Sequence, residues 1–366
     1  MKTLPRKQKQ GGWRWWGVGL LGLGLLLTGP AALTRPVVAA PPAPRPEMVT
    51  AETERAIKKG LEFLTRTQSR DGSWRNTGGW GAFPTCMTSL AGLSLLASGS
   101  TPVEGEHAPS VRKAVDFVVS CATPSGVISA MEEESRPMHS HGFAMLFLGQ
   151  AYGMERDELR RDKIRKVLQK AVELTGRAQS PDGGWLYTPD ANSDEGSVTV
   201  CEIQGLRSIR NAGIYVPKNI IDKAVKYVEL SQNPDGGIRY TARMGGESRP
   251  AISAAAVATL YNAGQFDHPA AKKCLDYIRN LFQRTGGTQA MYQGHEFYGM
   301  FYTAQAMYLA GERDWKTFFP TIREDLIRRQ AGDGSWTGDG VGTTYGTAIA
   351  LTILQLPYKY LPILQR

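Results

Sequence analysis

A short phrase that recurs about every 50 residues constrains this chain more than any other feature. The phrase is a short sequence motif that begins with a lysine, followed by apolar residues and, in most copies, one acidic residue. Clear copies begin at Lys59, Lys113, Lys170, Lys223 and Lys273, with a weaker sixth near 322–327. A fixed period of this size is typical of repeat architectures, in which each unit buries its apolar face against its neighbours. The sequence therefore predicts six similar units.

A second phrase, Gln-x-x-Asp-Gly-(Ser/Gly)-Trp, follows the first in four of the units. Asp-Gly is a turn pair, glutamine can bond backbone groups left open at a helix end, and tryptophan can cover a neighbouring helix. We therefore expect these residues to connect adjacent units through hydrogen bonds and packing, and not to act as catalysts. They are Gln68, Asp71 and Trp74; Gln179, Asp182 and Trp185; Gln232 and Asp235, followed by Ile238; and Gln330, Asp333 and Trp336.

Each unit contains two helical stretches of different character. In the fourth unit Ile220, Ala224 and Val228 recur at helical spacing on one face, and charged residues occupy the other. The second stretch, such as 253–260, is apolar or small on all sides and must be buried all round. Amphipathic helices outside and apolar helices inside predict an all-α fold. We expect an (α/α)6 toroid over residues 51–366, made of six helical hairpins around a hollow centre.

Residues 1–40 have the composition of a signal peptide or signal anchor, with a basic start, an apolar run and small residues after it. A Pro-rich linker is expected over 41–50. The leader holds six basic and no acidic residues, so the net charge of +9 leaves only +3 on the rest, which argues against a nucleic-acid partner. We expect an exported protein, periplasmic or anchored facing the periplasm, that contacts the membrane through this segment.

The second phrase and its spacing resemble the QW repeat of squalene–hopene and oxidosqualene cyclases, whose superfamily includes the β-subunits of protein prenyltransferases. Over residues 50–366 the chain is similar to bacterial prenyltransferase and squalene oxidase repeat proteins, including exported planctomycete members. The resemblance implies the toroid and its cavity. The Asp-x-Asp-Asp acid of class II cyclases is absent, and Thr199 stands where an Asp-x-Cys zinc pair ending at Cys201 would need aspartate. The resemblance therefore implies neither the acid-initiated cyclisation of class II cyclases nor the zinc chemistry of prenyltransferases for this chain.

Polar and metal-capable side chains gather at the expected starts of the inner helices, where they would rim the cavity. The residues expected to line it are Cys86, His139, His141, Cys201, Tyr298, Tyr302 and Tyr345. The tyrosines could hold an apolar chain or simply fill the core. The spacing of the four cysteines matches no zinc knuckle or CxxC motif, so we expect buried free thiols.

Three interpretations of these polar residues remain open. Acid–base chemistry would use Glu202, His295 and Glu296, because burial can shift their pKa values. Helix capping would use the same first-turn residues structurally. A zinc site is the third, since imidazole and thiolate suit zinc, and no other cofactor is implied. Its ligands would come from His139, His141, Cys201 and His295.

Three functions fit these observations. The first is a binder that holds a hydrophobic, isoprenoid-like small molecule or a protein segment in the central cavity. The second is a lyase or transferase that acts on an isoprenoid through a divergent acid/base or zinc site. The third is a structural scaffold of the cell envelope. Fold alone does not choose among them.

Overall fold

The computed structural model describes residues 45–365, apart from residues 77, 80, 288–290 and 293. The expected signal segment, residues 1–40, lies outside the described residues. A compact unit begins at Arg45. Residues 45–50 of the expected linker therefore belong to this unit, where Val49 is buried and Arg323 donates a hydrogen bond to the carbonyl oxygen of Met48.

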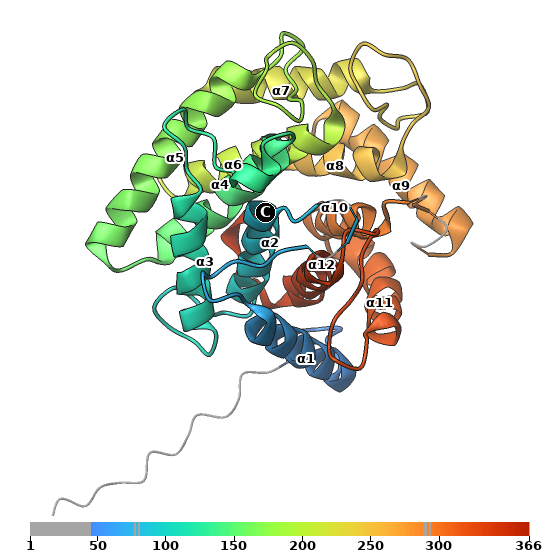
Figure 1. Cartoon of the computed structure of the whole chain (residues 1–366). Helices are drawn as coiled ribbons and strands as arrows, with labels where there is room; N and C mark the ends of the chain where they lie inside the picture. Colours follow the sequence, from blue (N-terminus) through green and yellow to red (C-terminus); the bar gives the residue numbers. More distant parts are fainter. Residues whose placement is uncertain (1–44, 77, 80, 288–290, 293, 366) are drawn as a thin grey trace, which may run out of the picture. The chain divides into compact units, whose positions relative to one another are not determined.

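The described residues form twelve α-helices (Figure 1) and no strand, only isolated bridges. This confirms the predicted all-α class. The helices are α1 (Ala51–Thr67), α2 (Pro84–Ala97), α3 (Ala108–Ser120), α4 (Pro137–Met154), α5 (Glu158–Ala178), α6 (Gly196–Asn211), α7 (Lys218–Ser231), α8 (Pro250–Asn262), α9 (Pro269–Thr285), α10 (Glu296–Ala310), α11 (Glu312–Arg329) and α12 (Thr343–Gln355). Short 3-10 turns occur at Met131–Glu133, Leu356–Tyr358 and Pro362–Leu364.

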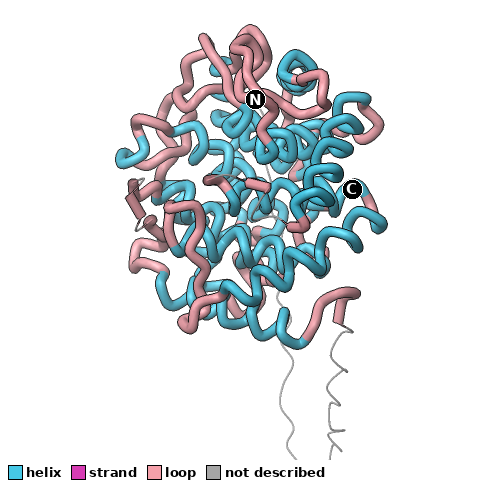
Figure 2. The backbone as a smooth tube through the Cα atoms, turned by 90° about the vertical axis from the view of Figure 1, so that its right-hand side faces the viewer, coloured by secondary structure: helices cyan, strands magenta, loops and turns pink. Residues whose placement is uncertain are grey.

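The even-numbered helices form the inner layer and the odd-numbered helices the outer layer. Every residue of α2 is buried, whereas α7 buries one face, on which Ile220, Ala224 and Val228 lie. The difference follows from sequence, because an apolar surface on all sides must be covered on all sides. Figure 2 shows that helices fill the body of this unit and that loops gather around its edge.

The inner helices close into a ring. Each packs on the next in the order α2, α4, α6, α8, α10 and α12, and α12 packs on α2. The first and last units also meet, because α1 contacts both the outer helix α11 and the inner helix α12 (Figure 1). The predicted toroid of six hairpins is therefore confirmed. Among the described residues, no helix combines the length and the apolar character required to cross a membrane.

The recurrent turns link each unit to the following outer helix. In all four copies the glutamine Nε2 donates to the carbonyl oxygen of its own turn glycine and to a second carbonyl oxygen near the start of that helix. Gln330 makes the second bond to Ala56 of α1 and so joins the last unit to the first. The tryptophan Nε1 groups donate to outer-helix carbonyl oxygens, for example Trp185 to Thr175 at 2.8 Å.

The centre of the ring is packed, which corrects the expectation of a hollow. Gln204 of α6 donates a hydrogen bond to Gln305 of α10, and Cys201 Sγ lies 3.5 Å from Tyr302 Oη. All four side chains are buried. The reason is geometric: α6 and α10 are separated by α8 in the ring order, yet their long side chains span the interior and meet.

The C-terminal tail, residues 359–365, closes the end of the ring where the inner helices stop. Leu361, Ile363 and Leu364 are each only 3% exposed. The amide of Ile363 donates to Gln150 Oε1 of α4 at 3.3 Å, and Tyr308 of α10 donates to the Gln365 side chain at 3.2 Å. A partly open space of about 10 Å³ lies beside this tail and is large enough for roughly one water molecule.

Candidate functional site

Glycines let α4 and α6 approach closely, which brings the starts of these two helices together. A Cβ atom on Gly142 would lie 2.7 Å from atoms of Cys201, and one on Gly205 would lie 2.9 Å from the Gly142 carbonyl oxygen. These separations are shorter than van der Waals contact allows, so only glycine fits without a shift of the helices. The crossing places His139, in the first turn of α4, beside Ser197, in the first turn of α6.

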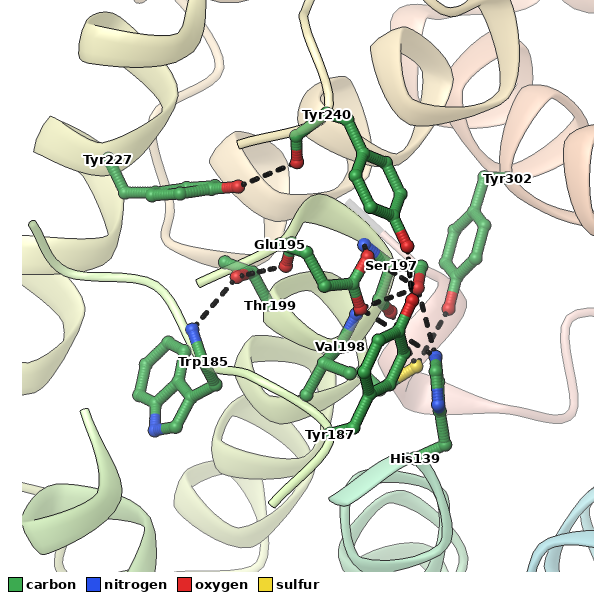
Figure 3. Close-up of polar contacts among 11 residues, drawn as sticks. His139, Trp185, Tyr187, Glu195, Ser197, Val198, Thr199, Tyr227, Tyr240 and Tyr302 are labelled. Atoms are coloured by element: carbon green, nitrogen blue, oxygen red, sulfur yellow. Dashed lines mark hydrogen bonds and ion pairs between the residues drawn. The ribbon is translucent and has the colours of Figure 1, made fainter. Parts of the chain in front are cut away.

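Figure 3 shows the resulting group of side chains, which we call the mouth cluster: His139, Tyr187, Glu195, Ser197 and Tyr240. His139 Nε2 lies 3.0 Å from Ser197 Oγ, which lies 2.6 Å from Glu195 Oε1. The hydroxyls of Tyr187 and Tyr240 bond to each other, and the His139 and Tyr187 rings are 5.5 Å apart. His139 is 29% exposed and Glu195 only 1%, so the cluster runs from solvent into the ring.

The proton positions follow from these distances. Ser197 has one hydroxyl proton and a carboxylate oxygen at 2.6 Å, so it donates to Glu195 and accepts from His139 Nε2. Burial lowers the pKa of His139 against the opposing attraction of Glu195. In a Ser–His–acid triad the imidazole takes the serine proton and the acid binds the other ring nitrogen. Here the Glu195 carboxylate, and not the imidazole, accepts the Ser197 hydroxyl proton. Ser197 is therefore not an activated nucleophile of the triad kind.

Carboxylates cap three alternate inner helices at this end of the ring. Glu133 caps α2, Glu195 caps α6 and Asp339 caps α10. Each accepts two backbone N–H groups at 2.7 to 3.2 Å, where the helix dipole favours a negative charge. Sequence reasoning missed all three. Glu195 directly precedes α6, so its capping role could have been predicted from the sequence. Glu133 and Asp339 lie more than 40 residues from the helices that they cap, so no local sequence pattern indicates their role.

Five of the seven residues predicted to line the cavity come together behind the mouth cluster. We call them the inner group: Cys86, Cys201, Tyr298, Tyr302 and Tyr345. The Tyr298 and Tyr302 rings are 4.8 Å apart, and Tyr345 interacts electrostatically with both thiols. Burial raises the pKa of both thiols and of the three phenols, so all five groups are neutral at pH 7. They therefore offer an uncharged aromatic and thiol surface.

One atom of the inner group stands out. The Tyr298 hydroxyl is buried and has no hydrogen-bond partner in the described part of the chain. Tyr298 and Tyr345 themselves are partly exposed, unlike Tyr302. A buried hydroxyl without a partner has a free-energy cost of about 1–3 kcal/mol, so a ligand or water that supplied one would bind favourably.

His141 and Glu202 do not face the ring interior, which corrects two predicted positions. Both contact Thr175 of the outer helix α5: His141 Nε2 lies 3.1 Å from its hydroxyl, and Glu202 Oε2 lies 3.3 Å from it. Burial lowers the pKa of His141 to about 4 and raises that of Glu202 far above its usual value. Both groups are neutral and lie between the layers, where each is 0% exposed and neither is open to a substrate.

His295 and Glu296 are also separate from the mouth cluster. His295 is exposed and precedes α10, while Glu296 forms a two-point ion pair with Arg329 of α11 at 2.8 and 3.0 Å. Glu296 is thus a link between layers and not a free acid. The structure does not gather His139, His141, Cys201 and His295, and the described residues contain no group of three or more His, Cys, Asp or Glu able to hold a metal.

All four cysteines are free thiols, as predicted. Cys86, Cys201 and Cys274 are buried and Cys121 is partly buried. Burial raises the pKa of Cys274 to about 12, and it raises those of the other three as well. None of them is a reactive thiolate at neutral pH.

Two family models match this chain. The prenyltransferase alpha-alpha toroid domain matches residues 48–148, and the squalene-hopene cyclase C-terminal domain matches residues 155–323. Together they extend over most of the ring described above. Over these two stretches the chain is therefore similar to the α/α-toroid domain of prenyltransferases and to the C-terminal domain of squalene-hopene cyclases.

A curated relative is alpha-onocerin synthase LCD of Lycopodium clavatum, 31% identical over 144 residues. The match covers 36% of this chain and only 18% of that enzyme. The chain therefore spans about a fifth of the length of the curated relative that it matches.

Solved structures share the fold at low identity. A variant of the type II terpene cyclase MstE from Scytonema, solved with geranylgeranyl dihydroxybenzoate as substrate, matches with a TM-score of 0.58 at 14% identity, over 85% of this chain and 98% of that one. The GH76A alpha-1,6-mannanase from Salegentibacter sp. HEL1_6 matches with a TM-score of 0.61 at 9% identity, over 84% and 99%. Since the two act on unrelated substrates, the likeness defines the fold alone.

Proposed function

We propose that this protein binds an apolar, isoprenoid-like ligand at the mouth cluster, outside the packed centre of the ring. The observation that carries the proposal is the meeting of partly exposed aromatic and polar side chains at one end of the inner helices. The opposite end is covered by the C-terminal tail. Aromatic side chains with a few convergent polar groups are typical of small-molecule sites.

The contacts suggest how such a ligand would lie. Its apolar part would rest on the partly exposed rings of Tyr187, Tyr240, Tyr298 and Tyr345. A polar atom would satisfy the buried Tyr298 hydroxyl. The geranylgeranyl substrate bound by the Scytonema cyclase supports the isoprenoid class. This placement replaces the expected central cavity, because Gln204 and Gln305 fill the middle of the ring.

Binding is favoured over catalysis because the carboxylates near the mouth cluster are hydrogen-bonded to helix starts. Glu133, Glu195 and Asp339 each accept two backbone N–H groups of a helix start. A carboxylate whose oxygens already accept hydrogen bonds from a helix start is not positioned to approach an alkene carbon as a general acid. The chain also lacks the Asp-x-Asp-Asp acid of the class II cyclases.

The test is to identify what purified protein retains and where it binds. Organic extraction and mass spectrometry should recover an apolar small molecule, and farnesol should bind in a titration. Tyr187→Ala and Tyr240→Ala should each weaken farnesol binding at least about tenfold, since each removes a large aromatic contact. Tyr360→Ala, a 51% exposed tyrosine on the C-terminal tail, serves as the control. Failure of farnesol and other isoprenoids to bind, or recovery of a peptide instead, would contradict the proposal.

A second candidate is an enzyme that acts on an isoprenoid as a lyase or transferase. The hydrogen-bonded chain from His139 through Ser197 to Glu195 supports it, because a neutral imidazole near solvent can act as a general base. Mass spectrometric detection of turnover of polyprenyl substrates, abolished in His139→Gln, would establish it. Binding without any product from a panel of such substrates would exclude it.

We also propose that the protein is exported, because its first 40 residues combine a basic start with an apolar run. Cell fractionation and N-terminal sequencing of the mature protein would test this. Recovery of the intact chain in the cytoplasm would contradict it.

A further inference from the structure

The tetrapeptide Glu-Ser-Arg-Pro occurs twice in the chain, and both copies stand at the start of an inner helix. The first is 134–137 before α4, and the second is 247–250 before α8. In each copy the arginine is the N-cap residue and the proline begins the helix. In the described part of the chain no side chain caps either helix start, whereas carboxylates cap the starts of α2, α6 and α10.

Each of these arginines stacks on one tyrosine of the mouth cluster. The Arg136 guanidinium carbon lies 4.9 Å from the Tyr187 ring centroid, and that of Arg249 lies 4.5 Å from the Tyr240 centroid. The hydroxyls of these two tyrosines bond to each other, as Figure 3 shows. Each arginine therefore stacks on one member of a single hydrogen-bonded tyrosine pair.

The charges of both arginines act on the same place. Burial raises the pKa of Tyr187, with Glu195 adding to the rise, and both Arg136 and Arg249 oppose it. Two guanidiniums from different units of the ring thus lie within electrostatic range of one phenol. The starts of α4 and α8 add the positive ends of two helix dipoles.

No carboxylate forms an ion pair with either arginine among the residues that the structure describes. Arg136 and Arg249 are exposed and take part in none of the ion pairs there, and Glu134 and Glu247 of the same tetrapeptides pair with neither. The nearby Glu133 and Glu195 are occupied by helix starts. Planar guanidiniums present paired N–H donors to carboxylate or phosphate oxygens, and helix starts favour anions.

We propose that Arg136 and Arg249 form a clamp for the anionic head group of the ligand, a carboxylate or phosphate, while its apolar chain lies over the tyrosines. This inference rests on the proposed function and specifies it: the ligand is an amphipathic isoprenoid-like acid or phosphate and not a neutral hydrocarbon. The Ser-Arg-Pro segments set each arginine at the start of an inner helix, and each guanidinium stacks on one tyrosine of the bonded pair.

The experiment compares three probes that share one chain: farnesoic acid, farnesyl monophosphate and farnesol. Isothermal titration should show that at least one anionic probe binds about tenfold or more tightly than farnesol. Arg136→Gln and Arg249→Gln should each weaken that anionic probe about tenfold and change farnesol binding less than about twofold. Raised salt should weaken the anionic probe selectively. Whichever of farnesoic acid and farnesyl monophosphate binds more tightly identifies the head group as a carboxylate or a phosphate.

Arg161→Gln is the matched control, because Arg161 also stacks on a tyrosine, Tyr152, at 5.2 Å, but at the start of the outer helix α5. It should leave all three affinities unchanged. Thermal melting checks that each variant folds, and Arg136→Met or Arg249→Met, which also removes the charge and keeps an unbranched side chain, replaces any glutamine variant that does not.

Equal binding of acid, phosphate and alcohol, or equal loss of all three in the arginine variants, would overturn the clamp and leave the apolar site standing. Absence of binding by every probe would overturn the proposed function together with it.

Discussion

Gln204 of α6 donates its side-chain amide to the side-chain oxygen of Gln305 of α10 across the interior of the ring. The two side chains are 0% and 1% exposed, and Gln305 also donates to the Phe301 carbonyl oxygen at 3.2 Å. The bond joins two helices that are not neighbours in the ring order. The middle of the toroid is therefore a packed layer, and a ligand is restricted to the mouth.

Replacing one member of this pair should destabilise the fold. Gln204→Leu leaves the buried Gln305 oxygen without its donor, and the free energy of unfolding in urea should fall by about 1–3 kcal/mol. The double variant Gln204→Leu/Gln305→Leu should lose less than the sum of the two single losses, because it buries no unpaired amide. Simple additivity of the two single changes would show that the pair contributes nothing.

The ring itself was predictable from sequence because its signals are local. The lysine phrase marks six units, and the Asp-Gly turns follow it in phase in four of them. The contrast between a one-sided helix such as α7 and an apolar one such as α8 separates the layers. The same contrast explains what was missed. A helix that is buried on all sides has no polar face, so its sequence does not show which side points to the ring axis.

Glu202 and His141 illustrate this limit. Both lie in helices buried all round, and both point to the outer layer instead of the axis. His139 and His141 are only two residues apart, yet a helix turns them to different sides, one to the mouth cluster and one to Thr175. The contact between Gln204 and Gln305 could not be predicted for another reason: the two residues are 101 positions apart in the sequence, and no local pattern relates them.

His141 should make the fold less stable as the pH falls. Burial lowers its pKa from 6.5 to about 4, so between these values the unfolded chain binds the proton and the folded chain does not. Stability due to the neutral imidazole is then complete above about pH 6.5 and is lost as the pH falls towards 4, by up to about 3 kcal/mol. His141→Gln should remove this slope from a series of urea titrations, whereas an unchanged slope would refute the assignment.

Glu202 should act in the opposite direction. Burial raises its pKa far above the usual value, so the folded protein keeps a proton that the unfolded chain releases above about pH 4.5. Its contribution to stability is therefore largest at acidic pH and decreases as the pH rises. Glu202→Gln should raise the melting temperature at pH 8 relative to wild type and have little effect at pH 4. A variant that is less stable than wild type at pH 8 would contradict this assignment.

The close crossing of α4 and α6 should tolerate no side chain at Gly142. Its Cβ would lie 2.7 Å from Cys201, whereas a Cβ on Gly153, exposed near the end of the same helix, meets nothing within 4 Å. Gly142→Ala should therefore destabilise the fold by about 1–3 kcal/mol through overpacking. Gly153→Ala should stay within about 0.5 kcal/mol of wild type or gain slightly, because alanine is the better helix former. The crossing also sets His139 against Ser197 at 3.0 Å, so Gly142→Ala should weaken farnesol binding as well, and Gly153→Ala should not. Equal stability of the two variants would mean that the helices have room to separate and that glycine is not what holds the mouth cluster together.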